Sequence, residues 1–219
     1  MKKHIEFDIE FKKNPYPGKF IVFEGIDGSG KTTQANLLAE ELNKKGIKTI
    51  YTKNPTDHAI GKFIRTVLSG EEKIPPQATQ YLFNADRVVQ QEEIIKHLKK
   101  GGVVISDRYF WSSVAYGMAD IGENTETLLT VYSILSFYHQ FLLPDLTFFL
   151  DTKTDVAMSR IKEKNGQEIY ENKVFLEKVQ STYKVLLDMF ADEFFITDSN
   201  HTIKEVSKAV LEKVRGVVV

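Results

Sequence analysis

The chain has no cysteine among its 219 residues, which excludes disulfide bonds and thiolate metal sites. It has no apolar run near the roughly 20 residues of a membrane-spanning helix, and its N-terminus lacks the apolar core of a signal peptide. It also has no excess of positive charge with which to neutralise nucleic-acid phosphates, because 29 Lys and Arg face 30 Asp and Glu. We therefore expect a cytoplasmic protein that binds neither membranes nor nucleic acid.

What the sequence does contain is an alternation of short apolar runs with longer amphipathic stretches. Five runs predict buried strands: Phe20–Phe23, Lys48–Tyr51, Val103–Ser106, Leu146–Leu150 and Glu193–Ile196. Six stretches predict helices: Thr32–Lys45, Thr79–Lys100, Thr125–Phe141, Val156–Lys164, Lys173–Ala191 and Thr202–Val214. Alternating strands and helices favour right-handed βαβ units. We predict a three-layer α/β domain over residues 19–219, with a five-stranded parallel sheet flanked by helices.

Residues 1–18 form a separate N-terminal extension. Apolar residues alternate with acidic ones from Ile5 to Phe11, which is typical of a half-buried strand. A stretch with two prolines and a glycine, Asn14–Gly18, then breaks the chain. We predict an added strand that either packs at the edge of its own domain or exchanges with a partner subunit.

A phosphate-binding loop is the most specific motif. Residues Gly25–Thr32 fit the pattern G-x-x-x-x-G-K-[ST] between a predicted strand and a predicted helix. In this motif the lysine, Lys31, reaches the β- and γ-phosphates, and the Thr32 hydroxyl binds Mg²⁺. A glycine-rich turn without a ligand is the alternative. We predict the P-loop NTPase fold and an ATP phosphate site of Gly25, Gly28, Ser29, Gly30, Lys31, Thr32 and Thr33.

Asp107 and Arg108 follow the predicted strand Val103–Ser106, at the end where doubly wound sheets bind ligands. The carboxylate suits Mg²⁺ and the guanidinium suits a phosphate, although an ion pair at a strand end is the alternative. The sequence has no Asn-Lys-x-Asp guanine-reading motif, which weighs against a GTPase switch. The number of predicted strands is too low for a large mechanical ATPase.

From about residue 19 to the C-terminus, the chain resembles thymidylate (dTMP) kinases. The matching segments, in the family's order, are Phe23–Gln34, Asn54–Asp57, Ile60–Arg65, Leu82–Arg87, Asp107–Tyr109, Ser112–Tyr116, Pro144–Asp151 and Tyr170–Asn172. The P-loop alone is unspecific, whereas the combination is highly specific. The usual family pattern has no counterpart of residues 1–18.

The resemblance implies a deoxynucleotide site. Phe83 would stack on thymine, Arg87 would donate to a base carbonyl, and Ser112 would line the base pocket. Tyr116 would occupy the place of a ribose 2′-hydroxyl, and Tyr170 would also contact dTMP. Burial of the phenylalanine in the core and exposure of the arginine to solvent are the alternatives for these two helix residues.

The resemblance also implies which residues handle the phosphates and the sugar. Asp27 would contact the sugar 3′-hydroxyl and help to position the acceptor, while Arg108 and Lys53 would bind the monophosphate. The expected catalytic residues are Asp27, Lys31, Arg108 and Arg160. Because the acceptor phosphate is already an anion, no general base is needed.

Three positions expected to contact phosphates depart from the family pattern. Lys53 replaces an arginine, which keeps the charge but loses the bidentate fork. The family's transition-state arginine is missing, because its P-loop position is Gly28 and its position in the lid, about residues 160–172, is Ile169. The remaining lid cations are Arg160, Lys162 and Lys164. We expect one of them to close over the phosphates, with stacking of Arg160 on adenine as the alternative.

The implied reaction is ATP + dTMP → ADP + dTDP with Mg²⁺, a step of dTTP synthesis. Gly117 stands where a polar side chain often helps to read the base, so we expect dTMP as first substrate and dUMP as second. A kinase for another nucleoside or nucleotide and a nucleotide-binding homologue with weakened catalysis are the alternatives. The apolar stretch Thr125–Leu143 predicts burial on more than one face, and the resemblance implies a homodimer.

Overall fold

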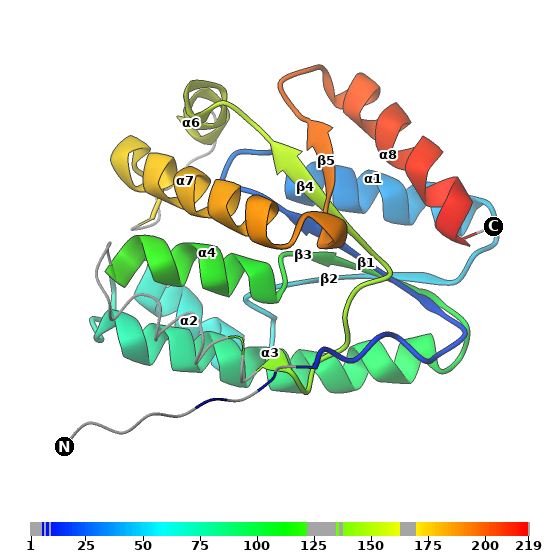
Figure 1. Cartoon of the computed structure of the whole chain (residues 1–219), viewed down its shortest axis with the longest axis horizontal. Helices are drawn as coiled ribbons and strands as arrows, with labels where there is room; N and C mark the ends of the chain where they lie inside the picture. The colour runs from blue at the N-terminus through cyan, green and yellow to red at the C-terminus, as the bar shows by residue number, and fades with distance from the viewer. Residues whose placement is uncertain are drawn as a thin grey trace.

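The computed structural model describes residues 6, 8, 10–121, 135, 138–162 and 170–218. Its centre is one parallel sheet with the strand order β2-β3-β1-β4-β5 (Figure 1). The strands are β1 Lys19–Glu24, β2 Thr49–Lys53, β3 Val103–Asp107, β4 Leu146–Asp151 and β5 Phe195–Asp198. The predicted five-stranded parallel sheet is therefore confirmed. The fifth strand begins two residues later than expected, because Ala191–Glu193 form a 3₁₀ turn.

Helices cover both faces of this sheet. They are α1 Lys31–Lys44, α2 Ala59–Leu68, α3 Pro76–Leu98, α4 Phe110–Ile121, α6 Thr154–Lys162, α7 Lys173–Met189 and α8 Ile203–Val218. One core packs the inner face of α1 and α8 against side chains such as Ile21 and Phe23 of β1. The other packs α3, α4 and α7 against the opposite face, where Phe20 and Val22 lie. Every one of these β1 side chains is fully buried, as expected of a strand in the middle of a parallel sheet.

Two of these helices, α2 and α4, were not predicted. The first is only ten residues long, but it buries Ile64, Val67 and Leu68 on one face, so its sequence did carry a helical period that the prediction missed. The second begins with Phe110 and Trp111, and both of these residues are fully buried, as are Val114 and Ala115. A helix that is apolar on most sides shows no amphipathic pattern. Most of the predicted helix Thr125–Phe141 lies outside the described residues.

The N-terminal extension contacts its own domain. Lys12 forms a single parallel bridge with Leu142, and the Phe11 ring lies 6.0 Å from that of Phe110. Asn14 donates to Asp145 at 2.7 Å. The described part of the segment contains this bridge but no strand. Residues 5, 7 and 9 of the predicted strand lie outside the described part, so the added strand stays a prediction.

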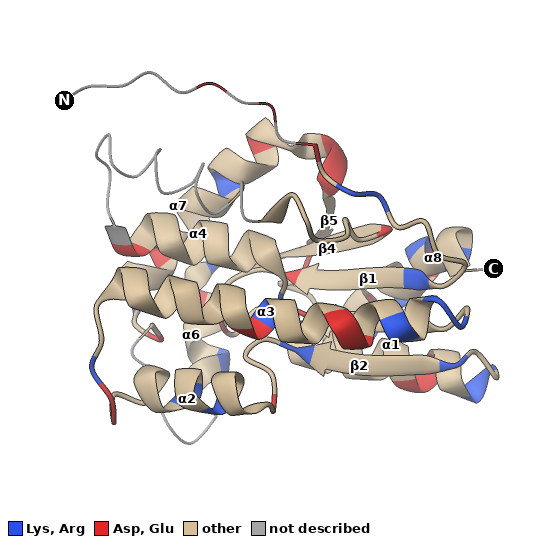
Figure 2. Ribbon diagram, turned by 90° about the horizontal axis from the view of Figure 1, so that it is seen from below, with Lys and Arg blue, Asp and Glu red and all other residues tan. Residues whose placement is uncertain are grey.

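The charged residues and the lengths of the helices are also informative. Lys and Arg are interspersed with Asp and Glu along the helices in Figure 2, as the net charge of −1 suggests. Across the ranges that the structure describes, no helix has both the length and the apolar character that crossing a membrane requires.

The sheet order fixes where a ligand site can form. β1 lies beside β3, and their register pairs Phe23 with Asp107. The P-loop leaves the carboxyl end of β1, and the turn at Arg108 leaves the carboxyl end of β3. These two sequence motifs, about 80 residues apart, therefore meet at one edge of the sheet.

Candidate active site

The P-loop, Gly25–Thr32, joins β1 to α1 in a conformation that needs glycine. Gly28 has φ +78° and Gly30, the N-cap of α1, has φ +97°, both in the left-handed region that other residues rarely adopt. A Cβ on Gly28 would lie 2.3 Å from the carbonyl oxygen of Ala157. The glycines thus allow the backbone to turn into the start of α1, where free N–H groups and the helix dipole favour an anion.

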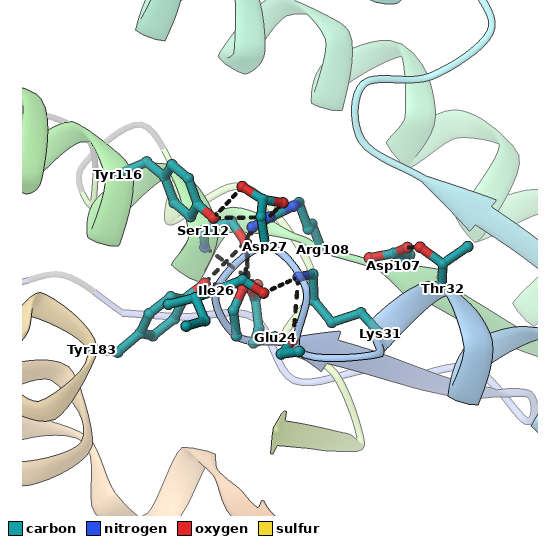
Figure 3. Close-up of polar contacts among 12 residues, drawn as sticks. Glu24, Ile26, Asp27, Lys31, Thr32, Asp107, Arg108, Ser112, Tyr116 and Tyr183 are labelled. Carbon is teal, nitrogen blue, oxygen red and sulfur yellow. Dashed lines mark hydrogen bonds and ion pairs between the residues drawn. The ribbon is translucent and has the colours of Figure 1, made fainter. Parts of the chain in front are cut away.

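Lys31 is a buried cation within this loop. Its side chain folds back, and Nζ donates a hydrogen bond to the Ile26 carbonyl at 2.7 Å (Figure 3). Burial and the neighbouring Arg108 lower the pKa of Lys31 to about 8, although the carboxylate of Asp27 opposes this shift. A triphosphate in the loop would add the negative charge that stabilises such an ammonium group.

Thr32 and Asp107 offer two oxygen ligands beside the loop. The Thr32 hydroxyl donates to Oδ2 of Asp107 at 2.5 Å. Hydroxyl and carboxylate oxygens suit Mg²⁺, which usually takes one or two protein ligands and completes its shell with phosphates and water. Among the described residues, no group of three or more His, Cys, Asp or Glu could hold a metal without such help. The residues present therefore fit a nucleotide-bound Mg²⁺.

Asp27, Arg108 and Tyr116 form a hydrogen-bonded triangle (Figure 3). Nη2 of Arg108 donates to Asp27 at 2.5 Å and to the Tyr116 hydroxyl at 2.9 Å, and that hydroxyl donates to Asp27 at 2.8 Å. Burial alone would raise the pKa of Asp27, but the charges of Arg108 and Lys31 and these hydrogen bonds lower it to about 2. The carboxylate is therefore ionised throughout the neutral pH range.

The backbone of Arg108 directs its side chain into this triangle. Its φ of +71° is uncommon for a residue other than glycine. Two hydrogen bonds hold the turn, from Arg108 N–H to the Phe23 carbonyl at 2.9 Å and from the Ser106 hydroxyl to the Arg108 carbonyl at 2.7 Å. The turn thus places the guanidinium between the P-loop and α4, where it also donates to the Ser112 hydroxyl at 3.1 Å.

Glu24 lies beneath the triangle, and the sequence reasoning did not assign it a role. It is fully buried, and it accepts hydrogen bonds from Tyr109 N–H at 2.9 Å, from the Tyr183 hydroxyl at 2.9 Å and from the Ser112 hydroxyl. Burial raises the pKa of Glu24, while the hydrogen bond from Ser112 and the positive charge of Arg108 act in the opposite direction. Its role is to fix the start of α4. The signal that could have indicated this role is an acidic residue at the end of an otherwise apolar strand.

Two cavities meet at this triangle. The larger follows the P-loop, and the smaller lies between α3 and α4. The predicted site residues that line the larger one are Asp27, Gly28, Ser29, Gly30, Lys31, Thr32, Thr33, Lys53, Asp107, Arg108 and Arg160. Those that line the smaller one are Asp27, Phe83, Arg87, Arg108, Ser112, Tyr116 and Tyr170. Of the predicted residues, Asp27 and Arg108 line both cavities. Gly25 lines neither, but its carbonyl accepts a hydrogen bond from Arg108 at 3.4 Å.

Within the smaller cavity, Arg87 is fixed by its neighbours. It is only 1% exposed, so the alternative of a solvated helix residue is wrong. Its terminal nitrogens donate to the Ser113 hydroxyl at 2.5 Å and to the Tyr109 carbonyl at 2.9 Å, and its guanidinium lies 5.6 Å from the centre of the Phe83 ring. At the mouth, the rings of Tyr170 and Tyr116 make an edge contact at 6.0 Å. The cavity therefore has aromatic walls and a fixed cation.

Asp86 is a second buried carboxylate that the sequence reasoning did not assign. It accepts hydrogen bonds from the Asn54 amide at 3.2 Å and from Thr56, through the backbone N–H at 2.8 Å and the hydroxyl at 2.5 Å. Arg65 of α2 holds the same loop from the other side by donating to the carbonyls of Pro55 and Thr56. Asp86 thus ties α3 to the loop that separates the two cavities.

Arg160 is the lid cation that the structure places at the P-loop. It donates to the carbonyl of Gly28 at 3.4 Å and to that of Ser199 at 2.9 Å. Lys53 lies at the opposite side of the larger cavity, with Nζ 3.6 Å from Asp57. Residues 163–169 of the predicted lid lie outside the described part of the chain.

Comparison with known proteins identifies the family. A family model described as thymidylate kinase matches residues 23–210. A thymidylate kinase of Thermosipho africanus is 40% identical over 202 residues, which cover 89% of this chain and 98% of that protein. A probable thymidylate kinase of Methanocaldococcus jannaschii is 36% identical over 200 residues, 90% of this chain and 96% of the relative. The structure of thymidylate kinase from Candida albicans matches with a TM-score of 0.78 at 30% identity, over 91% of this chain and 92% of that one. The chain therefore belongs to the thymidylate kinase family.

Proposed function

We propose that this protein transfers the γ-phosphoryl group of ATP to dTMP, which yields ADP and dTDP for dTTP synthesis. The observation that carries the proposal is the pair of cavities that meet at Asp27 and Arg108. One cavity contains a phosphate-binding loop, and the other has aromatic walls suited to a base. A kinase that acts on a nucleoside monophosphate needs two such sites with their phosphates facing each other.

On the donor side, Lys31 and the backbone N–H groups of the P-loop hold the β- and γ-phosphates. Thr32 and Asp107 would hold the Mg²⁺ that neutralises charge on these phosphates. Arg160 closes the cavity beside Gly28, and we assign it the cationic role that a P-loop or lid arginine has elsewhere in the family. The alternative, stacking of Arg160 on adenine, would use the same position.

On the acceptor side, Arg108 binds the monophosphate and keeps it in line with the donor. Asp27 orients this guanidinium and contacts the 3′-hydroxyl of the sugar. Phe83 stacks on the base, and Arg87 donates a hydrogen bond to a base carbonyl. Tyr116 is held in place by Asp27 and Arg108, and its ring fills the space that a 2′-hydroxyl would need. These contacts favour a deoxyribonucleotide with a carbonyl-bearing pyrimidine.

An acceptor panel tests the proposed function. With ATP and Mg²⁺, we expect turnover of dTMP first and of dUMP second, with dCMP, dGMP and UMP at least about tenfold lower in kcat/KM. ADP formation would be followed for each acceptor. Equal turnover of UMP and dTMP would contradict the role of Tyr116. Tight binding of ATP and dTMP without turnover would instead favour the homologue with weakened catalysis.

The chain also carries apolar side chains that a partner subunit would cover, and we propose a homodimer. Tyr81 and Val88 of α3 are 73% and 41% exposed, and they lie seven residues apart on one face of the helix. Phe63 of the adjoining α2 is 42% exposed. Light scattering should give about twice the chain mass of 25.1 kDa, and Tyr81→Glu should shift it toward the monomer. A wild-type mass of one chain would contradict the proposal.

A further inference from the structure

The smaller cavity contains a polar side chain, Gln80, that neither the sequence motifs nor the proposed mechanism uses. Gln80 lies on α3 three residues before Phe83 and seven before Arg87. Residues at this spacing share one face of a helix. All three line the smaller cavity, so α3 presents an amide, an aromatic ring and a guanidinium to the same space.

Two buried polar atoms on this face have no partner. Gln80 is 6% exposed and Arg87 is 1% exposed, yet Oε1 of the glutamine and Nε of the arginine make no hydrogen bond. Buried polar atoms are nearly always paired in folded proteins. The other arginine nitrogens are engaged by Ser113 and Tyr109, which fixes the direction of the Nε–H group. Both side chains belong to the lining of the smaller cavity, so a ligand bound there is the available partner for this acceptor and this donor.

This pair matches the edge of one class of base. Thymine and uracil present a carbonyl oxygen, O4, beside the donor N3–H. With the base stacked on Phe83, the arginine Nε–H can donate to O4 while Oε1 of Gln80 accepts from N3–H. Cytosine has the opposite pattern, an acceptor N3 beside a donor amino group. Rotation of the Gln80 amide would satisfy the cytosine N3 but would leave its amino group facing Arg87.

We propose that Gln80 is a specificity-determining residue that recognises the N3–H of thymine or uracil. The proposal rests on the proposed function and narrows it to bases that carry an imide N–H. It also explains how the base can be read although Gly117 has no polar side chain, since the polar contact comes from α3 instead of α4. If the Gln80 acceptor is removed, the N3–H of thymine is left without a partner. Binding of thymine is then weakened more than binding of cytosine, which has no N3–H.

The test combines a variant with a modified substrate. Gln80→Leu keeps the approximate size of the side chain and removes the acceptor, and 3-methyl-dTMP removes the donor. We expect Gln80→Leu to lower kcat/KM for dTMP by about tenfold, mainly through KM, and to reduce the preference for dTMP over dCMP by a similar factor. Methylation of N3 should cost wild type at least about tenfold and Gln80→Leu far less, because the two changes remove the same contact.

Gln77→Leu is the matched control, since Gln77 is exposed in the first turn of α3. If Gln80→Leu does not fold by thermal melting, Gln80→Met repeats the test with a flexible side chain of similar length. An unchanged dTMP to dCMP ratio in the variant, or an equal methylation penalty in both enzymes, would overturn the role of Gln80. Failure of the wild type to phosphorylate dTMP would overturn the proposed function instead.

Discussion

Replacement of Lys31 with alanine is expected to lower kcat by about 100- to 1000-fold and leave the protein folded. The ammonium group lies at the P-loop, where we propose that it neutralises charge that builds up on the transferring phosphoryl group. Its hydrogen bond to the Ile26 carbonyl is modest in energy, and burial lowers the pKa of Lys31 to about 8, so the folded protein gains little from this cation. The effect should therefore fall on catalysis. A coupled assay of ADP formation measures the loss of kcat, and a melting curve checks that the variant is folded.

The same lysine predicts a pH dependence. In the free protein Lys31 loses its proton as pH rises through about 8, whereas bound triphosphate would favour the charged form. Binding of ATP must then be accompanied by proton uptake, so its affinity should fall by up to about tenfold per pH unit above pH 8. Lys31→Ala should lack this dependence, and Lys44→Ala, at the exposed end of α1, should retain it. A kcat within threefold of wild type in Lys31→Ala would contradict the assignment.

Replacement of Arg108 with alanine is expected to have the second large effect, a loss of about 1000-fold in kcat/KM for dTMP. The guanidinium lines both cavities, so its removal would take away the proposed contact to the acceptor phosphate and the group that orients Asp27. A charge-assisted, two-nitrogen contact to a phosphate is among the stronger hydrogen bonds in proteins. Kinetics with varied dTMP should show the loss in both KM and kcat. Arg215→Ala, on the exposed side of α8, is the control.

Arg108→Ala should also change the acid stability of the protein. The pKa of Asp27 is about 2 against 3.8 when unperturbed, so its stabilising effect is present above pH 4 and is lost as pH falls toward 2. Without Arg108 that carboxylate keeps the cost of burial and loses its main partner, and we expect a loss of about 2 kcal/mol in the free energy of unfolding near pH 7. Urea titrations at pH 3, 5 and 7 measure this. If Asp27→Asn together with Arg108→Ala were no more stable than Arg108→Ala, the pairing argument would fail.

The sheet and most helices could be predicted because their signals are local. Each strand is a short apolar run bounded by polar residues, and the P-loop pattern marks the turn after β1. The helix α4 was missed because its sequence pattern depends on the elements packed around it. The residues of α4 are apolar on most sides because α3 and α7 both pack against this helix. The period of α2 was present in the sequence and was missed. The N-terminal alternation is typical of a strand, but only part of it is described, so that strand stays a prediction.

The candidate site divides in the same way. Lys31, Thr32, Asp107 and Arg108 could be selected because they occupy a motif or a strand end. Glu24 could not be assigned a role, because one of its partners, Tyr183, lies 159 residues further along the chain. Asp86 likewise acts through Asn54 and Thr56 on another element. Such positioning residues contact residues that are far away in the sequence, so their role cannot be predicted from one sequence alone.

The ion pair of Asp27 and Arg108 has a thermodynamic consequence for how strongly each substrate binds in the presence of the other. Because both residues line both cavities, a phosphate that draws the guanidinium toward one ligand changes the electric field felt by the other. The binding free energies of ATP and of the acceptor are therefore coupled. By linkage the coupling is reciprocal, so whatever factor ATP imposes on the affinity for dTMP, dTMP imposes on the affinity for ATP.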